Sequence, residues 1–259
     1  MQSRMANLQV SLRDGKRLLG LFTRAGTPEV AETLAASSLD FVVLDVEHGS
    51  LGRKEISHTI LVSSLKDLPV IVRLPDATRA GIQHALTVGA GGVIVPHVSS
   101  GREAEAIVAF ARSAAIERAY AGAGRETDFR RRSWTDYEVD VRQRFLVIAQ
   151  IDEQAGVRAA GEIAGIAGLD AVFMGSLSIA LSLGTPRVSD RIVQDALAQI
   201  CQSCTGAGRR IGMHLQDSGS EPLWSERGVS LYVIGNDFGL ILDGVEKAVS
   251  SFSTQAQKI

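Results

Sequence analysis

The stretch Phe41-Val-Val-Leu-Asp-Val-Glu-His-Gly49 decides the fold of this 259-residue chain. Its first four residues are apolar, as in a strand that is buried on both faces of a parallel sheet. Asp45, Glu47 and His48 follow within four positions, at the C-terminal end of that strand, where α/β folds place their active sites. The alternative is a polar turn in which Asp45 caps the next helix. The spacing alone supports both interpretations equally.

Short apolar strands alternate with helical stretches along the rest of the chain. Strands are expected at 18–22, 41–45, 69–73, 92–96, 145–151, 171–175, 210–215 and 231–235, and helices at 28–36, 53–66, 78–88, 101–112, 154–164, 189–205 and 238–250. This order predicts a single (β/α)8 TIM barrel over residues 1–259. A doubly wound open sheet is the alternative, but it rarely needs eight evenly spaced units. Residues 113–144 contain no clear strand and are longer than a plain connection, so we expect a loop excursion there.

Composition excludes several classes of function. The formal net charge is −2, which favours neither a nucleic-acid partner nor an anionic membrane. The sequence has no apolar run of the length needed to span a membrane, and its N-terminus lacks the apolar segment of a signal peptide. We therefore expect a cytoplasmic protein. Cys201 and Cys204 form a C-x-x-C inside an expected helix, where two partly buried thiols are favoured over a zinc or redox site.

Polar residues at the ends of the predicted strands are the candidates for chemistry. Arg73 ends an otherwise aliphatic strand, and its planar guanidinium suits a carboxylate or an enolate oxygen. An ion pair with Asp45 or Glu47 is the alternative role for Arg73, and the two roles are compatible. His48 is a candidate for proton transfer, because the ordinary pKa of histidine lies near neutrality and Asp45 is placed to orient the ring. His97 and His214 at other strand ends are equally compatible with structural and functional roles.

Six motifs in order resemble a known family. They are Leu44-Asp-Val-Glu-His48, Pro69-Val-Ile-Val-Arg73, Gly89-Ala-Gly-Gly-Val-Ile-Val-Pro96, Ile148-Ala-Gln-Ile-Asp152, Gly168-Leu-Asp-Ala-Val-Phe-Met-Gly175 and Ser182-Leu-Gly184. Over residues 18–250 the chain resembles the HpcH/HpaI aldolases, class II pyruvate aldolases of the phosphoenolpyruvate/pyruvate superfamily. Each motif alone is weak, but six in sequence are specific.

The resemblance implies a barrel whose last helix is exchanged between subunits of a hexamer. It also implies that an arginine and a divalent metal hold pyruvate as its enolate, while a histidine handles the proton of the hydroxyl or aldehyde oxygen. Arg73 matches the arginine and His48 the histidine, with Asp45 and Glu47 as acidic neighbours. The resemblance further suggests these substrate contacts: Arg73, Gln150, Gly175, Ser176 and Arg118.

The metal site and the loop depart from the family pattern. Asp152 stands where the family has a glutamate ligand, and Ser178 stands where it has an aspartate. A hydroxyl is a poor ligand for Mg²⁺ or Mn²⁺ compared with a carboxylate, so Asp152 predicts at most weak metal binding or independence of metal. Ala114-Ala-Ile-Glu-Arg118 replaces a Pro-Pro-x-Gly-x-Arg segment and keeps only Arg118. Substrate specificity is therefore not transferable from the family.

Three functions are carried forward. The first is an aldolase-type carbon–carbon lyase or synthase that acts through the enolate of pyruvate or oxaloacetate, with an aldehyde as the second substrate. The second is a metal-independent condensation of oxaloacetate with acetyl-CoA, as in the citrate synthases of siderophore biosynthesis. The third is a non-catalytic paralogue that binds a small acid. Retention of Asp45, Glu47, His48 and Arg73 favours an enzyme over a binding scaffold.

Overall fold

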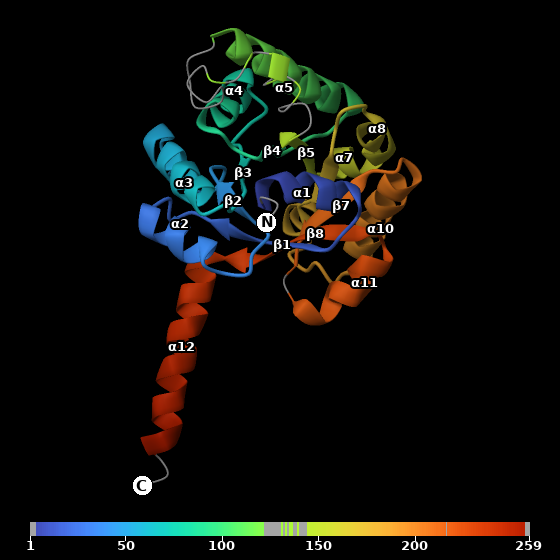
Figure 1. Ribbon diagram of the computed structural model, residues 1–259. Helices are drawn as coiled ribbons and strands as arrows, with labels where there is room; N and C mark the ends of the chain where they lie inside the picture. The colour runs from blue at the N-terminus through green and yellow to red at the C-terminus, as the bar shows by residue number, and fades with distance from the viewer. Residues whose placement is uncertain are drawn as a thin grey trace.

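The protein is a closed barrel of eight parallel strands that follow one another in sequence order (Figure 1). The computed structural model describes residues 4–121, 131, 133, 135–136, 139, 144–215 and 217–256. The strands are β1 (Leu18–Thr23), β2 (Phe41–Asp45), β3 (Val70–Arg73), β4 (Gly92–Val95), β5 (Leu146–Ile151), β6 (Ala171–Met174), β7 (Arg210–His214) and β8 (Val229–Asn236). Pairing of β8 with β1 closes the barrel. The predicted (β/α)8 fold is confirmed.

Helices surround the barrel, and some of them lie in segments where the sequence pattern did not predict a helix. They are α1 (Arg4–Arg13), α2 (Pro28–Ala35), α3 (Arg53–Leu65), α4 (Arg79–Val88), α5 (Gly101–Ala121), α7 (Gln154–Arg158), α8 (Ala160–Gly165), α9 (Ser176–Ser182), α10 (Arg191–Gly206), the 3₁₀ turn η2 (Ser218–Ser220), α11 (Glu221–Glu226) and α12 (Asp237–Ala256). The expected helix at 154–164 is two short helices. Helix α5 continues to Ala121, so the first part of the expected loop excursion at 113–144 is helical.

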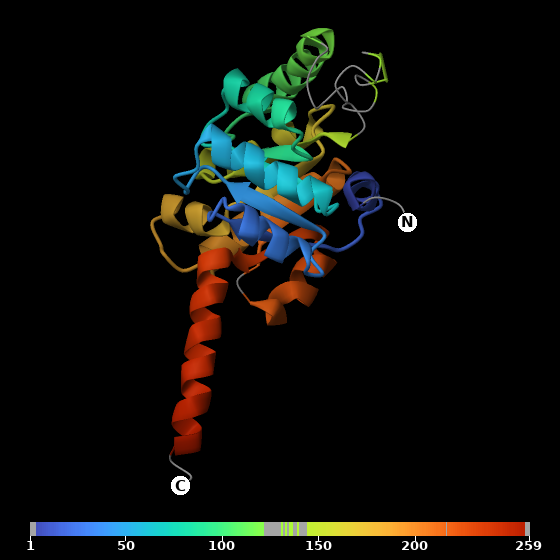
Figure 2. The ribbon, with the colours of Figure 1, turned by 60° about the vertical axis from the view of Figure 1, so that its left-hand side comes forward.

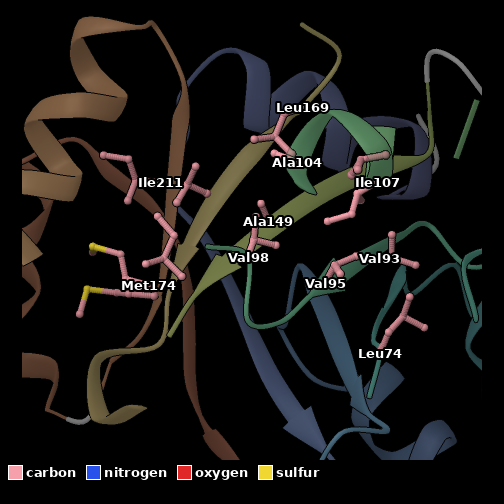
Figure 3. Close-up of a cluster of buried hydrophobic side chains, with 14 of the residues drawn as sticks. Leu74, Val93, Val95, Val98, Ala104, Ile107, Ala149, Leu169, Met174 and Ile211 are labelled. Atoms are coloured by element: carbon pink, nitrogen blue, oxygen red, sulfur yellow. The ribbon is translucent and has the colours of Figure 1, made fainter. Parts of the chain in front are cut away.

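Two layers of apolar side chains explain why these strands form a barrel. Every residue of β2 to β6 is buried, because one face points into the barrel and the other towards the helices. The inner layer includes Leu8, Leu12, Val43, Ile71, Ile94, Ile148 and Phe173. The first two belong to α1, which packs against this inner layer. Figure 3 shows part of the outer layer, where Val93, Val95 and Ala149 of the sheet lie near Ala104 and Ile107 of α5.

Local sequence signals set several helix boundaries. The Thr27 side chain accepts a hydrogen bond from Val30 N at the start of α2, and Thr78 accepts one from Gly81 N at the start of α4. Helix α4 ends at Gly89, whose φ of 86° lies in the left-handed region that glycine adopts at low cost. Thr27 lies in the connection that follows β1 and Thr78 in the connection that follows β3, so these caps mark where the helices begin close to the ends of those strands.

The last helix, α12, does not return to the outer ring of helices (Figures 1 and 2). It begins beside β1 and β8 and then projects away from the barrel. Six of its apolar side chains are each more than half exposed: Phe238, Ile241, Leu242, Val245, Val249 and Phe252. Even so, no helix in the described part of the chain is both long and apolar enough to cross a bilayer.

Candidate active site

The carboxyl ends of β2 and β3 bring the first candidate residues together. In the parallel register of these strands, Asp45 lies directly opposite Arg73. Asp45 is fully buried and Arg73 is 7% exposed. The sheet itself therefore places an anion beside a cation at the end of the barrel where (β/α)8 enzymes carry their active sites.

Arg73 is the centre of a group that we name the Arg73 cluster, formed with Asp45, Glu47 and His48. Arg73 Nε donates a hydrogen bond to Asp45 Oδ1 at 3.0 Å, and Nη2 lies 2.8 Å from Asp45 Oδ2. Nε is also 3.2 Å from Glu47 Oε2, and Nη2 is 2.9 Å from His48 Nδ1. The alternative role of Arg73, an ion pair with Asp45 or Glu47, is present with both carboxylates, and His48 joins the same cluster.

His48 can meet Arg73 in one tautomer only. A guanidinium nitrogen has no lone pair to accept a proton, so Arg73 Nη2 donates and His48 Nδ1 accepts. The ring proton is then on Nε2. Nδ1 also lies 3.7 Å from Asp45 Oδ1 and 3.7 Å from Glu47 Oε2. An unprotonated imidazole nitrogen is thus held next to a guanidinium, with two carboxylates close enough to stabilise an imidazolium.

The two carboxyl groups of the cluster have opposite pKa shifts. Burial alone would raise the pKa of Asp45, but the hydrogen bonds and charge of Arg73, together with Arg24, outweigh burial and lower the pKa. The pKa of Glu47 is raised, first by burial and then by the charge of Asp152, although Arg73, His48 and His97 oppose this shift. Asp45 is therefore the fixed anion, and Glu47 is the carboxyl group that takes up a proton more readily.

Arg24, the residue after β1, also holds the side chain of Asp45 in place. Arg24 Nε donates to Asp45 Oδ2 at 2.7 Å. The backbone there is held by Asp237 at the start of α12, whose Oδ2 accepts hydrogen bonds from Thr23 Oγ1, Arg24 N and Ala25 N at 2.8, 2.9 and 2.9 Å. Asp237 is buried, so the first turn of α12 positions the backbone of Arg24, whose side chain contacts Asp45.

His97 connects Glu47 with the end of β5. Its Nε2 lies 3.2 Å from Glu47 Oε1, its Nδ1 lies 3.8 Å from Asp152 Oδ2, and its backbone N donates to the same Asp152 oxygen at 2.9 Å. The φ of His97 is 59°, an unusual value for a residue other than glycine. Strain of this kind persists where surrounding contacts determine it, as Glu47 and Asp152 do here.

The remaining predicted residues lie at the ends of β5 and β6 and on α5 and α9. Gln150 Nε2 donates to both oxygens of Asp152, at 2.9 and 3.0 Å, and Asp152 is 1% exposed. Gly175 is required by this packing, because a Cβ there would stand 1.9 Å from Asp152 Oδ1. Ser176 is buried at the start of α9, and Ser178 is half-buried on the same helix. Arg118 lies on α5, but its side chain is outside the described residues.

Phe22 and His214 form one wall of the site. The Arg73 guanidinium carbon lies 4.3 Å from the centroid of the Phe22 ring, a cation–π contact. The His214 ring packs edge-on against Phe22, with centroids 5.8 Å apart. Burial lowers the pKa of His214, and the charge of Arg73 lowers it further, so the ring is neutral at neutral pH.

Sequence reasoning missed Arg24, placed Asp237 at a strand end without giving it a role, and was right that the two cysteines are buried thiols on a helix. Arg24 and Asp237 follow strands and carry charge, but no spacing rule links them to Asp45. For His97 the sequence is compatible with two roles, and its contacts place it in the site. Cys201 and Cys204 are buried on α10, and burial raises their thiol pKa values to about 11 and about 12. This environment supports two unreactive structural thiols.

Comparisons with known proteins show which family shares this sequence and fold. The family described as HpcH/HpaI aldolase/citrate lyase matches residues 18–238. A hydroxypyruvate/pyruvate aldolase from Roseovarius nubinhibens is 26% identical over 251 residues, covering 94% of this chain and 95% of the relative. The crystal structure of citrate synthase SbnG is 27% identical with a TM-score of 0.84, covering 96% of this chain and 98% of that one.

A solved HpcH/HpaI aldolase/citrate lyase family protein from Burkholderia cenocepacia has a TM-score of 0.88 at 25% identity, covering 96% of this chain and 99% of that chain. The matches extend along nearly the whole barrel rather than along one motif, and the relatives include named aldolases. The protein is therefore an enzyme of the aldolase/lyase type, and the chain belongs to the HpcH/HpaI aldolase/citrate lyase family.

Proposed function

We propose that the protein makes or breaks a carbon–carbon bond through the enolate of a small 2-oxo acid such as pyruvate or oxaloacetate. The observation that carries this proposal is the Arg73 cluster. A buried guanidinium, held by two carboxylates, faces an unprotonated histidine nitrogen. Stabilising the enolate is the main demand of this chemistry, and a fixed cation in a partly desolvated site meets it.

Arg73 is arranged to bind an anion as well as to pair with Asp45. Its hydrogen bonds and ion pairs to the described residues use Nε and Nη2, and none of them uses Nη1. The ring of Phe22 supports the guanidinium from one side. Nη1 is thus available for the carboxylate or enolate oxygen of a 2-oxo acid, and the remaining nitrogens keep the group oriented.

His48 supplies the base in this proposal. Its unprotonated Nδ1 is next to Arg73, so a substrate bound by Arg73 would bring its hydroxyl group towards that nitrogen. In the cleavage direction the substrate hydroxyl group displaces Arg73 Nη2 from the lone pair of Nδ1 and gives its proton to Nδ1. Asp45 and Glu47, each 3.7 Å from Nδ1, stabilise the imidazolium that forms. In the condensation direction the same proton returns to the new alkoxide.

The residues present fit a tightly held divalent ion poorly. Asp45, Glu47 and His48 lie close enough together to hold an ion, but the guanidinium of Arg73 already contacts all three. Both oxygens of Asp152 accept hydrogen bonds.

Two buried acceptor atoms, Glu47 Oε2 and Gln150 Oε1, have no hydrogen-bond partner among the described residues. One carboxylate oxygen and one amide oxygen are a small donor set for Mg²⁺ or Mn²⁺, and Ser178 adds only a hydroxyl. The proposed steps therefore use Arg73 and His48 and no resident metal.

Proton exchange at C3 of pyruvate and of oxaloacetate in D₂O, followed by NMR, tests the enolate directly. We expect exchange above the buffer background that is retained after treatment with EDTA. Exchange that EDTA abolishes and Mg²⁺ or Mn²⁺ restores would refute the metal-independent step while leaving the enolate in place. Absence of exchange with both acids, with and without metal, would refute the enolate proposal itself.

A citrate-synthase-like condensation of oxaloacetate with acetyl-CoA is the second candidate. Its support is the similarity to citrate synthase SbnG along almost the whole chain, together with the small donor set for metal. Release of free CoA from acetyl-CoA and oxaloacetate, measured with a thiol reagent, tests it. The buried Cys201 and Cys204 should contribute little background to that assay. A role in siderophore biosynthesis would follow only if citrate is formed.

The projecting helix α12 supports exchange of the last helix between subunits of a homo-oligomer such as a hexamer. Its exposed apolar stripe would be covered if it packed on a second copy. Light scattering coupled to size exclusion gives the mass. We expect Leu242→Glu with Val245→Glu to lower that mass, whereas Lys247→Glu, on the polar face of α12, should not. A wild-type monomer would refute the exchange.

A further inference from the structure

Arg24 follows β1 and contacts the Arg73 cluster, but the proposed function gives its side chain no contact with substrate. Its Nε donates to Asp45 Oδ2 at 2.7 Å, and neither of its Nη atoms has a partner among the described residues. The buried polar atoms that lack a partner in this part of the chain include neither of these atoms nor Arg73 Nη1, so all three donors are open to solvent. A second guanidinium with unused donors therefore lies beside the first.

The two guanidinium groups are close because they share one carboxylate oxygen. Arg73 Nη2 lies 2.8 Å from the Asp45 Oδ2 atom that accepts from Arg24 Nε at 2.7 Å. These two nitrogens are therefore at most 5.5 Å apart, the sum of the two distances. A four-carbon diacid has about 4 Å between its carboxylate carbons at standard bond lengths. One small molecule can thus contact both guanidinium groups.

Arg73 alone is sufficient to pair with Asp45. It contacts both oxygens of that carboxylate, through Nε at 3.0 Å from Oδ1 and Nη2 at 2.8 Å from Oδ2. Among the described residues, the side chain of Arg24 contacts no acid besides Asp45. Arg24 therefore adds a positive charge beyond the one that pairs with Asp45. Its two Nη atoms form an edge of the planar fork that can donate two parallel hydrogen bonds to a carboxylate.

Arg24 is also held in place before any ligand binds. Asp237, which is buried, accepts hydrogen bonds from the backbone N of Arg24 and of Ala25, each at 2.9 Å. Gly49 packs closely on the other side, because a Cβ there would lie 3.7 Å from Arg24 Cβ and 2.5 Å from Asp45 O. The side chain is 33% exposed, and its Nε is fixed by Asp45. Such preorganisation reduces the entropy that is lost when the Nη atoms bind an anion.

We propose that Arg24 binds the second carboxylate of a four-carbon 2-oxo dicarboxylic acid, so that oxaloacetate is preferred to pyruvate. The inference rests on the proposed function and names its substrate class. Arg73 holds the 2-oxo acid end, Arg24 holds the C4 carboxylate, and C3 between them is the carbon that becomes part of the enolate. Arg24 is thus a specificity-determining residue, and no bond of the substrate changes at its side chain.

Calorimetric titration with malate and with 2-hydroxybutyrate tests this role without turnover. Both acids have four carbons and a hydroxyl group in place of the 2-oxo group, but C4 is a carboxylate in the first and a methyl group in the second. The wild type should bind malate more tightly than 2-hydroxybutyrate by about tenfold to a hundredfold, as expected for hydrogen bonds between charged groups. Arg24→Gln should lose this preference by about tenfold or more, and Arg24→Lys, which keeps the charge but not the fork, should retain part of it.

The ratio of the two affinities separates substrate binding from a purely structural role of Arg24. If Arg24 only held Asp45 in place, Arg24→Gln would weaken binding of both acids by the same factor and leave the ratio unchanged. Arg102→Gln is the matched control, because Arg102 is exposed on α5 outside the site and its loss should not alter the ratio. Thermal unfolding establishes that each variant is folded at the temperature of the titration.

Two results would overturn the inference: a wild type that binds both acids equally, and a folded Arg24→Gln variant that keeps the wild-type ratio. The C3 proton exchange of pyruvate reports separately on the proposed function. Exchange accompanied by either result would retain the enolate chemistry and remove Arg24 from substrate recognition. A preference for malate that depends on Arg24, without exchange of pyruvate or oxaloacetate, would refute the enolate proposal and leave Arg24 as a carboxylate-binding residue.

Discussion

Replacement of Arg73 by lysine keeps a positive charge at the end of β3 but removes the planar fork on which the site depends. Arg73 contacts Asp45 through two nitrogens, and its Nη2 also donates to His48 Nδ1. An ammonium group is a single point charge on a flexible stem, so it can keep an ion pair with Asp45 but cannot reproduce all three contacts. The variant therefore separates the charge of Arg73 from its geometry.

The expected magnitudes follow from the burial of Asp45 and from the interactions that each variant removes. Arg73→Ala leaves Asp45 as a buried anion with Arg24 and the backbone N of His48 as its described hydrogen-bond donors, and breaking a buried pair costs about 3–5 kcal/mol. For a domain of this size that free energy lowers Tm by about 6–20 °C. Arg73→Lys should cost about 1.5–3 kcal/mol, the value of one hydrogen bond to a charged group. Loss of one preorganised donor to the developing charge should lower kcat by about 10²–10³.

The assay combines thermal unfolding with C3 proton exchange of pyruvate. At a temperature well below the Tm of each variant, Arg73→Lys should be folded and should exchange about 10²–10³ more slowly than wild type. Arg102→Lys is a matched control, because Arg102 is exposed on α5 outside the site and should affect neither readout. A folded Arg73→Lys variant that exchanges as fast as wild type would show that neither the fork nor its contacts support the enolate.

Three further predictions concern charges and thiols. The pKa of Glu47 is raised in the folded protein, so its ionised form costs stability, and Glu47→Gln should increase Tm at pH 7. This increase in Tm should disappear as the pH falls towards 4, where Glu47 is protonated in the wild type. At pH 7 the variant should also exchange the C3 protons of pyruvate more slowly than the wild type. The pKa of Asp45 is lowered, so this carboxylate stabilises the fold above the ordinary carboxyl pKa; Asp45→Asn should reduce the unfolding free energy in urea at pH 7 by about 3–5 kcal/mol, and the deficit should shrink in acid. Cys201 and Cys204, with pKa values of about 11 and about 12, should react with a thiol reagent only after denaturation, and rapid labelling of the native protein would contradict their burial.

The sequence predicted the barrel well because each strand is a short apolar run between helical stretches. Burial on both faces is a signal that depends on residue type alone, and the structure has every residue of β2 to β6 buried. The pattern did not indicate α9 and α11, which are only seven and six residues long. Helices of one or two turns carry too few periodic positions to be recognised, and tertiary contacts stabilise them.

The candidate site was predictable where the sheet builds it and unpredictable where loops build it. Asp45 and Arg73 end adjacent strands, so parallel register alone brings them side by side. Arg24 and Asp237 also follow adjacent strands, β1 and β8, but their contact depends on the path of the chain after β1. The position of His97 depends on its own left-handed backbone conformation. A histidine in the sequence does little to predict such a conformation.

The charge arrangement at the barrel mouth supports the proposal that the site acts without a resident divalent ion. Asp45 is neutralised by two guanidinium groups, Arg24 and Arg73. Asp152 is stabilised by hydrogen bonds, and Glu47, whose pKa is raised, already shares Arg73 and His97. A further cation would find Glu47, which already shares Arg73 and His97, and Asp152, whose two oxygens already accept hydrogen bonds. A 2-oxo acid would find a guanidinium whose Nη1 has no described partner. The site as built therefore has more to offer an anion than a metal, which is the physical basis for assigning the enolate to Arg73.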